Sequence, residues 1–449
     1  MAVAEQSVGS ESVPRAPGAV PLLGHALRLW RDPFGFLTSL RAHGELVRLD
    51  LGTMPIYVAT SAEVVHEVTV RQARSFEKGR FFDRLRPLAG NGLANANGDV
   101  HRAHRRLIQP MFAKDRIVAY SDAMRRNARA VSDRWTAGQE IDVAHEMAAF
   151  SIETLASTMF SSDIGRPAVE AIRRNLPIAL KNLLVRAASP KILDRLPIRP
   201  NREFDAAVAE LRQVIDEVIR TARTEQHTGH DDLLSLLLAE GDRLSDTEVR
   251  DELSTILFAG AETTAGTLAW AFHELAGHPE VERQVVAEIA EVVGDRPVTI
   301  EDVPRLRTVR RVLDEVIRLH GVTFLMRRAT EPVVLNGVRL PAGTEVAFSL
   351  YALHRDPNVY AHAGRFDPDR WLPERQEEAG LGREAFIPFG AGNRKCLGDQ
   401  FIYTEATIAL ATWLPRWKLV PVPGHTPKEI ASAVAAADRI PMTVTERRA

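Results

Sequence analysis

Near its carboxyl end the chain reads Phe389-Gly390-Ala391-Gly392-Asn393-Arg394-Lys395-Cys396-Leu397-Gly398. Cys396 is the only cysteine among 449 residues, so it has no partner for an intramolecular disulfide. Positive charge from Arg394 and Lys395 favours the thiolate, the form of cysteine that binds metals or attacks electrophiles. The glycines at 390, 392 and 398 permit positive φ angles and a close approach of the backbone to a large flat ligand. The residues that follow predict a helix, whose first N–H groups would stabilise the thiolate.

The residues of this loop leave two interpretations open. A lone cysteine in a Gly-rich turn is commonly a small buried apolar residue with a structural role. The complete pattern F-x-x-G-x-R-x-C-x-G instead resembles the haem-binding loop of the cytochrome P-450 family, the haem-thiolate monooxygenases. This resemblance, which extends from about Pro21 to about Thr445, implies that Cys396 is the metal ligand. Its thiolate would bind the iron of haem b (iron protoporphyrin IX) and favour cleavage of the O–O bond.

The composition is that of an ordinary globular enzyme, with 45% hydrophobic and 26% charged residues. A formal net charge of -2 favours neither nucleic acid nor a membrane surface as partner. One cysteine fits a reducing compartment, so we expect a soluble, cytoplasmic protein. The first 20 residues show neither a secretory signal nor a membrane anchor. The longest apolar stretch, Leu253–Ala276, contains Glu262 and Glu274 and is predicted to be a buried helix rather than a membrane span.

The predicted organisation is a flexible N-terminal tail, residues 1–20, followed by a single catalytic domain over residues 21–449. Helical periodicity dominates the first half of that domain. Further local signals are a helix start at Asp32-Pro33, a β-hairpin over Glu45–Thr60, a Gly- and Asn-rich break at residues 90–98 and strands over Leu335–Ser349. The expected fold class is mainly α with small β-sheets (α+β). The resemblance implies the cytochrome P-450 fold, with haem between a long central helix and the cysteine loop.

A long helix is predicted to begin at the capping box Ser245-Asp246-Thr247-Glu248 and to end near Gly277. Its length of about 30 residues far exceeds the mean of about 11 to 12. The middle of this segment is small or apolar on nearly every side, so the helix should cross the protein interior.

Within that helix, Glu262 is costly unless it is hydrogen-bonded or functional. The Thr263 hydroxyl competes for backbone carbonyls, which predicts a local kink with an ordered water. A tolerated packing site of small residues is the alternative for this short motif. The resemblance implies two catalytic residues: Thr263 would hold the bound oxygen and its water, and Glu262 would relay protons. It assigns Thr264 a structural role.

Two further motifs are interpreted as structural. Glu315 and Arg318 lie at i and i+3 on one helix face, and the resemblance implies that they join Arg370 in a buried ion network. His354 belongs to a turn common in the family and is not expected to bind metal. Gly321 stands where the family commonly has proline, which puts the conformation of that substrate-pocket loop in doubt.

Haem carries two propionates, which arginine or protonated histidine binds through charge-assisted hydrogen bonds. His101 and Arg105 are one helical turn apart and suit this role, although a basic helix face is usually just solvated. The resemblance implies four propionate ligands: His101, Arg105, Arg327 (with the adjacent Arg328 as the alternative) and Arg394.

The function implied is insertion of oxygen from O2 into an apolar small molecule, by a protein expected to be a monomer. No Gly-rich phosphate loop is present, so no flavin or nucleotide domain is fused. Electrons are therefore expected from NAD(P)H through a ferredoxin reductase and a ferredoxin. A basic patch on the cysteine side is predicted to receive the ferredoxin. Its proposed members are Arg102, Arg106 and Lys395.

The substrate prediction depends on five candidate pocket segments rich in Leu, Phe, Val and Ala, which favour a hydrocarbon-like ligand. They are Phe81–Leu93, Leu176–Leu193, Leu257–Ala261, Gly321–Leu325 and Ala431–Ala437. Residues 21–52 and 366–375 also resemble actinobacterial sesquiterpene oxygenases, which implies a terpene of secondary metabolism, such as pentalenene. A fatty-acid or macrolide hydroxylase is the alternative. The Glu262-Thr263 pair argues against a peroxide-driven peroxygenase, and against a haem protein that only binds.

Overall fold

The computed structural model describes residues 8–160, 166–188, 194–225, 232–380, 382 and 384–447. The chain divides into two compact units that are each assembled from distant parts of the sequence. Unit 1 comprises Met1–Asp83, Ile317–Cys396 and Ala431–Ala435, and unit 2 comprises Arg84–Val316, Leu397–Ile430 and Ala436–Ala449. Because the chain passes between the units several times, no linker marks the division in the sequence. The single catalytic domain over residues 21–449 stays a prediction.

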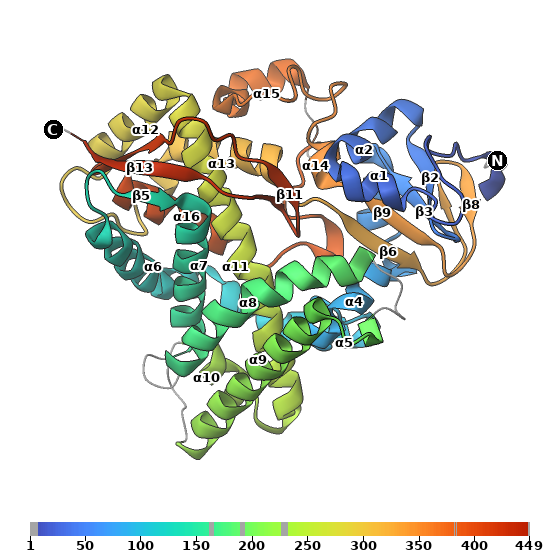
Figure 1. Cartoon of the computed structure of the whole chain (residues 1–449), viewed down its shortest axis with the longest axis horizontal. Coiled ribbons are helices and arrows are strands. Elements are labelled where there is room, and N and C mark those ends of the chain that lie inside the picture. The colour runs from blue at the N-terminus through green and yellow to red at the C-terminus, as the bar shows by residue number, and fades with distance from the viewer. Residues whose placement is uncertain are drawn as a thin grey trace. The chain divides into compact units, whose positions relative to one another are not determined.

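Unit 1 is built on a five-stranded sheet of order β2-β3-β9-β6-β4, and Figure 1 labels its strands β2, β3, β6 and β9. Its strands are β2 (Leu46–Leu51), β3 (Met54–Ala59), β4 (Phe76–Lys78), β6 (Leu325–Ala329) and β9 (Glu345–Phe348). The predicted hairpin is confirmed, since β2 and β3 pair antiparallel from Leu46↔Ala59 to Leu51↔Met54. Gly52 closes the turn at φ +62°, a conformation that glycine adopts without steric cost.

A second sheet of unit 1 includes part of the segment predicted to be a flexible tail. The strands are β1 (Val8–Gly9), β7 (Val333–Leu335) and β8 (Val338–Leu340), and β1 pairs parallel with β8. Farther along, the Ala16 N–H donates to the Arg48 carbonyl at 2.8 Å. From residue 8 onward the predicted tail therefore follows a defined path in the structure. Backbone hydrogen bonds to distant segments hold it, and its small and polar composition does not reveal them.

Short helices complete unit 1. They are α1 (Ala26–Arg31), α2 (Pro33–Ser39), α3 (Ala62–His66), α14 (Leu350–Leu353) and α15 (Pro373–Ala379), with a π-helical turn at Glu67–Arg71. The predicted helix start is confirmed, because the Asp32 carboxylate accepts from the Gly35 N–H at 2.9 Å and Pro33 is the first helical residue.

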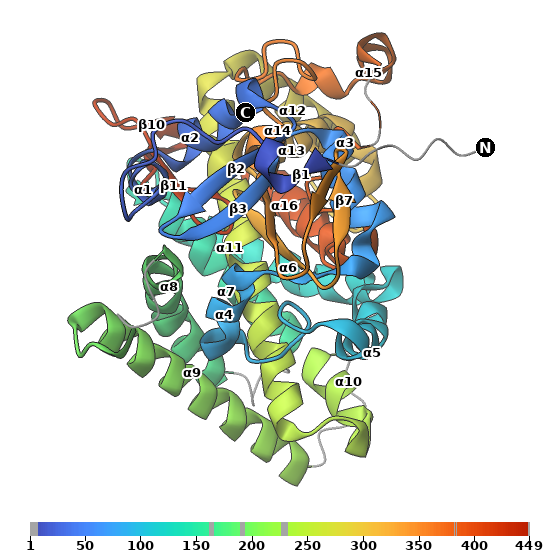
Figure 2. The same cartoon turned by 90° about the vertical axis from the view of Figure 1, so that its right-hand side faces the viewer.

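Unit 2 is mostly helical. Its elements are α5 (Gly98–Ile108), α6 (Lys114–Arg134), β5 (Glu140–Asp142), α7 (Val143–Met159), α8 (Arg166–Ala188), α9 (Arg199–Thr224), α10 (Leu233–Ala239), α11 (Asp246–Gly277), α12 (Pro279–Val292), α16 (Asp399–Trp413), β10 (Trp417–Pro421) and β13 (Pro441–Glu446). α8 and α9 lie side by side, and α7 packs along α11 (Figure 2). The division passes through α4 (Arg80–Ala89), α13 (Arg307–His320), β11 (Glu429–Ala431) and β12 (Ala435–Ala437).

The predicted long helix is confirmed as α11, which runs for 32 residues. The Ser245 hydroxyl accepts from the Glu248 N–H, and the Glu248 carboxylate accepts from the Ser245 N–H, which completes the capping box. Gly260 lets α7 approach closely, since a Cβ atom there would lie 2.9 Å from Leu155 Cδ2. Within the described part of the chain, no helix combines the length and the apolar character that crossing a bilayer requires.

Candidate functional site

The loop that carries Cys396 has a defined backbone in unit 1. Gly390 and Gly392 adopt φ +70° and +67°, and a Cβ atom on Gly392 would lie 1.9 Å from the Thr69 carbonyl oxygen. The Cys396 N–H donates to the Phe389 carbonyl at 2.9 Å and closes the loop. Gly398 differs from the prediction, because its φ of -88° is one that any residue adopts. The side chain of Cys396 is exposed, which argues against the interpretation that it is a buried residue with a structural role.

His354 supports the segment that leads into this loop. The Ile387 N–H donates to His354 Nε2 at 3.2 Å, and Gly390 N–H donates to the Ile387 carbonyl at 2.8 Å. Burial, followed by the charge of Arg318, lowers the pKa of His354 to about 3. The ring is therefore neutral, which allows Nε2 to accept a hydrogen bond. This contact supports the structural role predicted for His354.

Arg318 is fully buried and organises the chain around His354. Its Nη1 donates to the carbonyls of His354 at 2.8 Å and Ala363 at 2.7 Å, and Nη2 donates to the Arg365 carbonyl at 3.1 Å. Its guanidinium lies 5.2 Å from the centre of the Tyr360 ring. Arg318 thus binds three backbone oxygens of one irregular segment, which fits a structural role.

The other members of the predicted ion network are buried too. Glu315 is fully buried, and Arg370 is 7% exposed. Arg370 donates to the Ala361 carbonyl at 2.9 Å and lies over the same Tyr360 ring as Arg318. Gly321, which follows α13, fits tightly as well, since a Cβ atom there would lie 2.3 Å from the Ile317 carbonyl oxygen. A side chain at this position would require a different backbone path.

Three cations of unit 1, Lys78, Arg327 and Arg394, are here called the cation cluster, because, in addition to burial, the charge of Arg394 lowers the pKa of both Lys78 and Arg327. Lys78 of β4 is directly opposite Arg327 of β6 in the antiparallel register. Like charges directly opposite each other destabilise a strand pair. Burial and then the charges of Arg327 and Arg394 hold the pKa of Lys78 well below its ordinary value. Burial and then the charge of Arg394 lower the pKa of Arg327 to about 10.

The structure also separates Arg327 from its predicted alternative. Arg328 is neutralised by carboxylates, with Nη2 at 2.9 Å from Asp83 and 2.7 Å from Glu345, and Nη1 at 3.4 Å from Glu77. Burial lowers the pKa of Arg328, but hydrogen bonds to Asp83 and Glu345 and the charges of these two carboxylates together raise it above its ordinary value. Arg327 faces cations instead, so of the two adjacent arginines it is the one whose surroundings favour binding of an anion.

The cation cluster and the thiol together fit haem. A ligand with two carboxylates relieves the mutual repulsion of Lys78, Arg327 and Arg394. The thiolate of Cys396 provides a soft ligand suited to iron, and it belongs to the same loop as Arg394. Lys78 is a member that the sequence does not single out, because it belongs to no motif. Its pairing opposite Arg327 and its lowered pKa are what associate it with the cluster.

In unit 2, α11 places the predicted acid and alcohol on a partly exposed stretch of an otherwise buried helix. Glu262 and Thr263 are both half-buried. The Thr263 hydroxyl donates to the carbonyls of Ala259 at 3.1 Å and Gly260 at 3.4 Å, so it does engage the helix backbone as predicted. The α-helical assignment continues through this stretch, and the predicted kink with its water stays a prediction. Gly260 serves helix packing, so the small-residue interpretation holds for that position.

Thr264 lies on the buried side of α11, next to an acid that sequence reasoning did not identify. Glu405 of α16 is fully buried. Burial raises the pKa of Glu405 to about 8, and the nearby hydroxyls of Thr264 and Thr154 only partly oppose that shift. Three helices, α7, α11 and α16, therefore meet at a carboxyl group that is protonated at neutral pH. This position supports the structural role predicted for Thr264.

The predicted basic residues of α5 differ in exposure. His101 is buried and Arg105 is half-buried, so these two do not form a simply solvated face. Arg102 and Arg106 are exposed, and Arg102 pairs with Asp99. Lys395 is exposed in unit 1. Of the candidate pocket segments, residues 189–193 lie outside the described residues, and lining of a pocket by the others stays a prediction.

Comparisons with known proteins identify the family of this chain. The family described as Cytochrome P450 matches residues 14–440. Cyclooctat-9-en-7-ol 5-monooxygenase of Streptomyces melanosporofaciens is 43% identical over 92% of this chain and 90% of its own length. Pentalenene oxygenase of Streptomyces avermitilis is 39% identical over 93% of this chain and 94% of its own length. The crystal structure of the cytochrome P450DA heme domain superposes with a TM-score of 0.85 and 28% identity, covering 97% of this chain and 98% of that chain.

The predicted mainly helical fold with small sheets and the predicted enzyme class are both confirmed by these matches. Membership implies haem iron as cofactor, a small-molecule substrate and a redox partner. Both the cysteine loop and the long helix lie within the matched residues. The chain therefore belongs to the cytochrome P450 family.

Proposed function

We propose that the protein is a haem-thiolate monooxygenase that inserts one oxygen atom from O2 into a terpene. The observation that carries the proposal is the exposed Cys396 thiol in the same unit as the cation cluster. The names of the relatives that are 43% and 39% identical support the substrate class. A sesquiterpene such as pentalenene is the first candidate.

Each site residue has a proposed task. Cys396 binds the iron as a thiolate. His101, Arg105, Arg327 and Arg394 bind the propionates, and Lys78 joins them. When bound, the haem supplies the activation of O2. Thr263 and Glu262 hold and move protons on the partly exposed stretch of α11.

The proposed electron route is from NAD(P)H through a ferredoxin reductase and a ferredoxin. The exposed cations Arg102, Arg106 and Lys395 support an acidic partner protein, because complementary charge speeds encounter. We further propose that the protein acts as a monomer in the cytoplasm. The need to keep its single thiol reduced supports that compartment.

Turnover tests the proposal. The purified haem protein is incubated with a ferredoxin, its reductase, NADPH and pentalenene, and products are identified by mass spectrometry. We expect a product heavier by one oxygen atom, which carries the label when 18O2 is supplied. Cyclooctat-9-en-7-ol, a fatty acid and a macrolide are run in parallel. If only the fatty acid or the macrolide were oxygenated, and neither terpene, the proposed substrate class would be wrong.

Thr263→Ala is expected to lower the product formed per NADPH consumed. General acid–base groups contribute about 10²- to 10⁴-fold, and water replaces part of a lost hydroxyl, so we expect a drop of at least about tenfold. The missing electrons should appear as hydrogen peroxide, which is quantified alongside product. Thr263→Ser retains the hydroxyl and should restore most of the coupling. If Thr263→Ala formed as much product per NADPH consumed as the unmodified protein, Thr263 would have no role in the proton path.

Lys78→Met is expected to weaken haem binding. One charge-assisted hydrogen bond contributes about 1.5–3 kcal/mol, which corresponds to roughly a tenfold to hundredfold increase in the haem dissociation constant. Transfer of haem to apomyoglobin measures the loss. Lys418→Met is the matched control, since Lys418 is an exposed lysine on strand β10 of unit 2. Equal transfer rates for the two variants would exclude Lys78 from the haem site.

A further inference from the structure

The Gly- and Asn-rich stretch at residues 90–97 lies directly on the first half of α11. Both segments belong to unit 2. A Cβ atom on Gly90 would lie 2.0 Å from the Asp251 carboxyl group, and one on Gly92 would lie 2.3 Å from the Thr255 hydroxyl. The glycines of this stretch are therefore required for contact with the helix.

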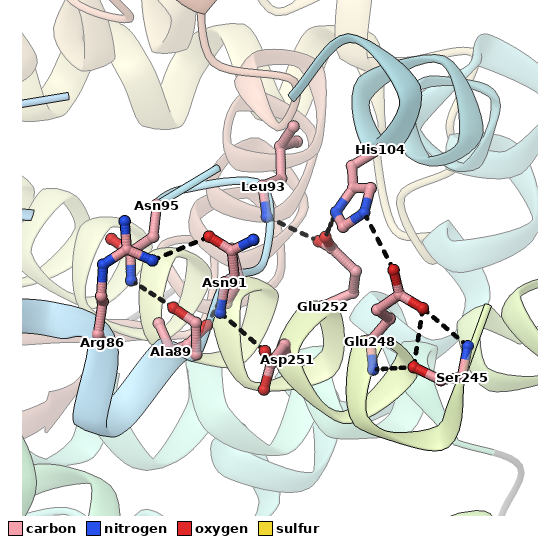
Figure 3. A network of polar contacts seen from close by, with 12 residues as sticks. Arg86, Ala89, Asn91, Leu93, Asn95, His104, Ser245, Glu248, Asp251 and Glu252 are labelled. Atoms are coloured by element: carbon pink, nitrogen blue, oxygen red, sulfur yellow. Dashed lines mark hydrogen bonds and ion pairs between the residues drawn. The ribbon is translucent and has the colours of Figure 1, made fainter. Parts of the chain in front are cut away.

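Side chains of α11 bind the backbone of this stretch at several points. The Asn91 N–H donates to Asp251 Oδ2 at 2.7 Å. The Thr255 hydroxyl donates to the carbonyl of Ala89, the last residue of α4, at 3.3 Å. These contacts hold the beginning of residues 90–97 against the helix, and Figure 3 shows the one between Asn91 and Asp251.

Glu252 binds the loop and a neighbouring helix with one carboxylate. Its side chain is fully buried. Oε2 accepts from the Leu93 N–H at 3.0 Å, and Oε1 lies 2.6 Å from His104 Nδ1 (Figure 3). A buried carboxylate is costly without such partners, so the loop and the His104 ring both contribute to keeping this charge inside.

His104 projects from α5 towards three carboxylates of α11. Glu252 makes the direct contact, Glu248 Oε1 lies 3.9 Å from His104 Nε2, and the charge of Asp251 acts in the same sense. The hydrogen bond to Glu252, in opposition to burial, raises the pKa of His104 above its ordinary value. These residues belong neither to the proposed haem ligands nor to the proposed proton path.

We propose that Glu252 and His104 form a clamp that positions residues 90–97 for binding of the apolar substrate. The clamp acts through the loop and touches neither substrate nor haem. The proposal rests on the proposed function in one respect, that the segment Phe81–Leu93 contacts the substrate. Loss of the Glu252 contacts releases the Leu93 N–H, and the middle of residues 90–97 is then no longer held against α11.

Hydrogen–deuterium exchange of the substrate-free haem protein tests the clamp. Glu252→Ala removes both contacts, and we expect residues 90–97 to exchange at least about tenfold faster, since each contact is a hydrogen bond to a charged group. Glu252→Gln keeps an acceptor for Leu93 and should show a smaller increase. The affinity for 4-phenylimidazole, an apolar ligand of haem iron, is measured on the same samples and should fall at least about fivefold in Glu252→Ala.

The control is Asp246→Asn, which removes an exposed acid of the same helix that pairs with Arg223. It should leave exchange of residues 90–97 unchanged. Faster exchange confined to Leu93 would overturn the proposal, because the pair would then be a local contact only. If residues 90–97 exchanged faster in Glu252→Ala but the affinity for 4-phenylimidazole did not change, the proposed role of the clamp in ligand binding would be overturned. Failure of the proposed function is visible separately, in the carbon monoxide spectrum of the unmodified protein.

The pH dependence separates a clamp from simple packing. Because the folded pKa of His104 is raised, the stabilisation by its charge is complete below about 6.5, the ordinary pKa of histidine, and is lost as pH rises through the folded value. Exchange of residues 90–97, corrected for intrinsic rates, should therefore quicken across that interval in the unmodified protein. His104→Gln retains a donor for Glu252 and should give intermediate exchange with no such pH response. An identical response in His104→Gln would assign the titration to another group and overturn the clamp.

Discussion

Cys396→Ser is expected to abolish thiolate ligation, which would be the largest spectroscopic change caused by any single substitution in the protein. The reduced, carbon monoxide-bound form of the unmodified protein should show the red-shifted Soret band of thiolate-ligated haem, and the serine variant should lack it. Serine has nearly the same size, and the Cys396 N–H bond to the Phe389 carbonyl uses only backbone atoms. The loop is therefore expected to keep its path while the sulfur is lost.

The controls for this experiment follow from the composition. No other cysteine is present, so no second thiol can substitute for Cys396. Haem content is measured by the pyridine haemochrome method, which separates loss of the ligand from loss of the cofactor. A variant that retains both haem and the red-shifted band would reject Cys396 as the ligand. A histidine-like spectrum in the unmodified protein would reject the whole assignment.

The parts of the site that were predictable depend on short, local sequence patterns. The cysteine loop can be recognised in the sequence because its backbone requires glycine at particular positions. Gly390 and Gly392 adopt positive φ angles, and Gly392 lies against the Thr69 carbonyl. The capping box at Ser245 and the turn at Gly52 are local in the same sense. Local patterns thus predicted the start of the long helix, the turn of the hairpin and the cysteine loop.

The parts that were missed depend on pairing between distant segments. The place of Lys78 in the cation cluster could not be predicted, because it depends on the pairing of β4 with β6. That pairing puts Lys78 opposite Arg327, which lies some 250 residues later in the chain. In the sequence, Glu252 looks like any acidic residue in the first third of a helix. Its role becomes apparent only in the structure, where His104 of α5 contacts its carboxylate. Glu405 follows the cysteine motif closely, but its protonation depends on burial beside Thr154 and Thr264. No single stretch of sequence contains these relations.

The described part of the predicted tail shows the same limit for the fold. Residues 8–20 are small and polar, which favours disorder when the segment is considered alone. In the structure, backbone groups of this segment bind β8 and Arg48, partners that composition does not report.

Arg318→Leu is expected to leave little or no folded, haem-containing protein. The substitution removes three donors from the carbonyls of His354, Ala363 and Arg365. A buried polar group without a partner costs about 1–3 kcal/mol, so three of them approach the whole stability of a typical protein, about 5–15 kcal/mol. The loss also affects the cysteine loop through His354, because the N–H of Ile387, which lies just before the loop, donates to that ring.

Arg318→Lys should rescue little of this loss, because the three carbonyls are bound by two nitrogens of one planar guanidinium, a geometry that a single ammonium does not reproduce. The measurements are the yield of soluble protein, its Soret-to-280 nm absorbance ratio and its far-ultraviolet circular dichroism. Arg365→Leu is the matched control: it changes an exposed arginine of the same segment and leaves the backbone carbonyl that Arg318 binds. If Arg318→Leu folded and bound haem as well as this control, the three hydrogen bonds would contribute little to the unit. The position of the cysteine loop would then have to depend on contacts other than those of Arg318.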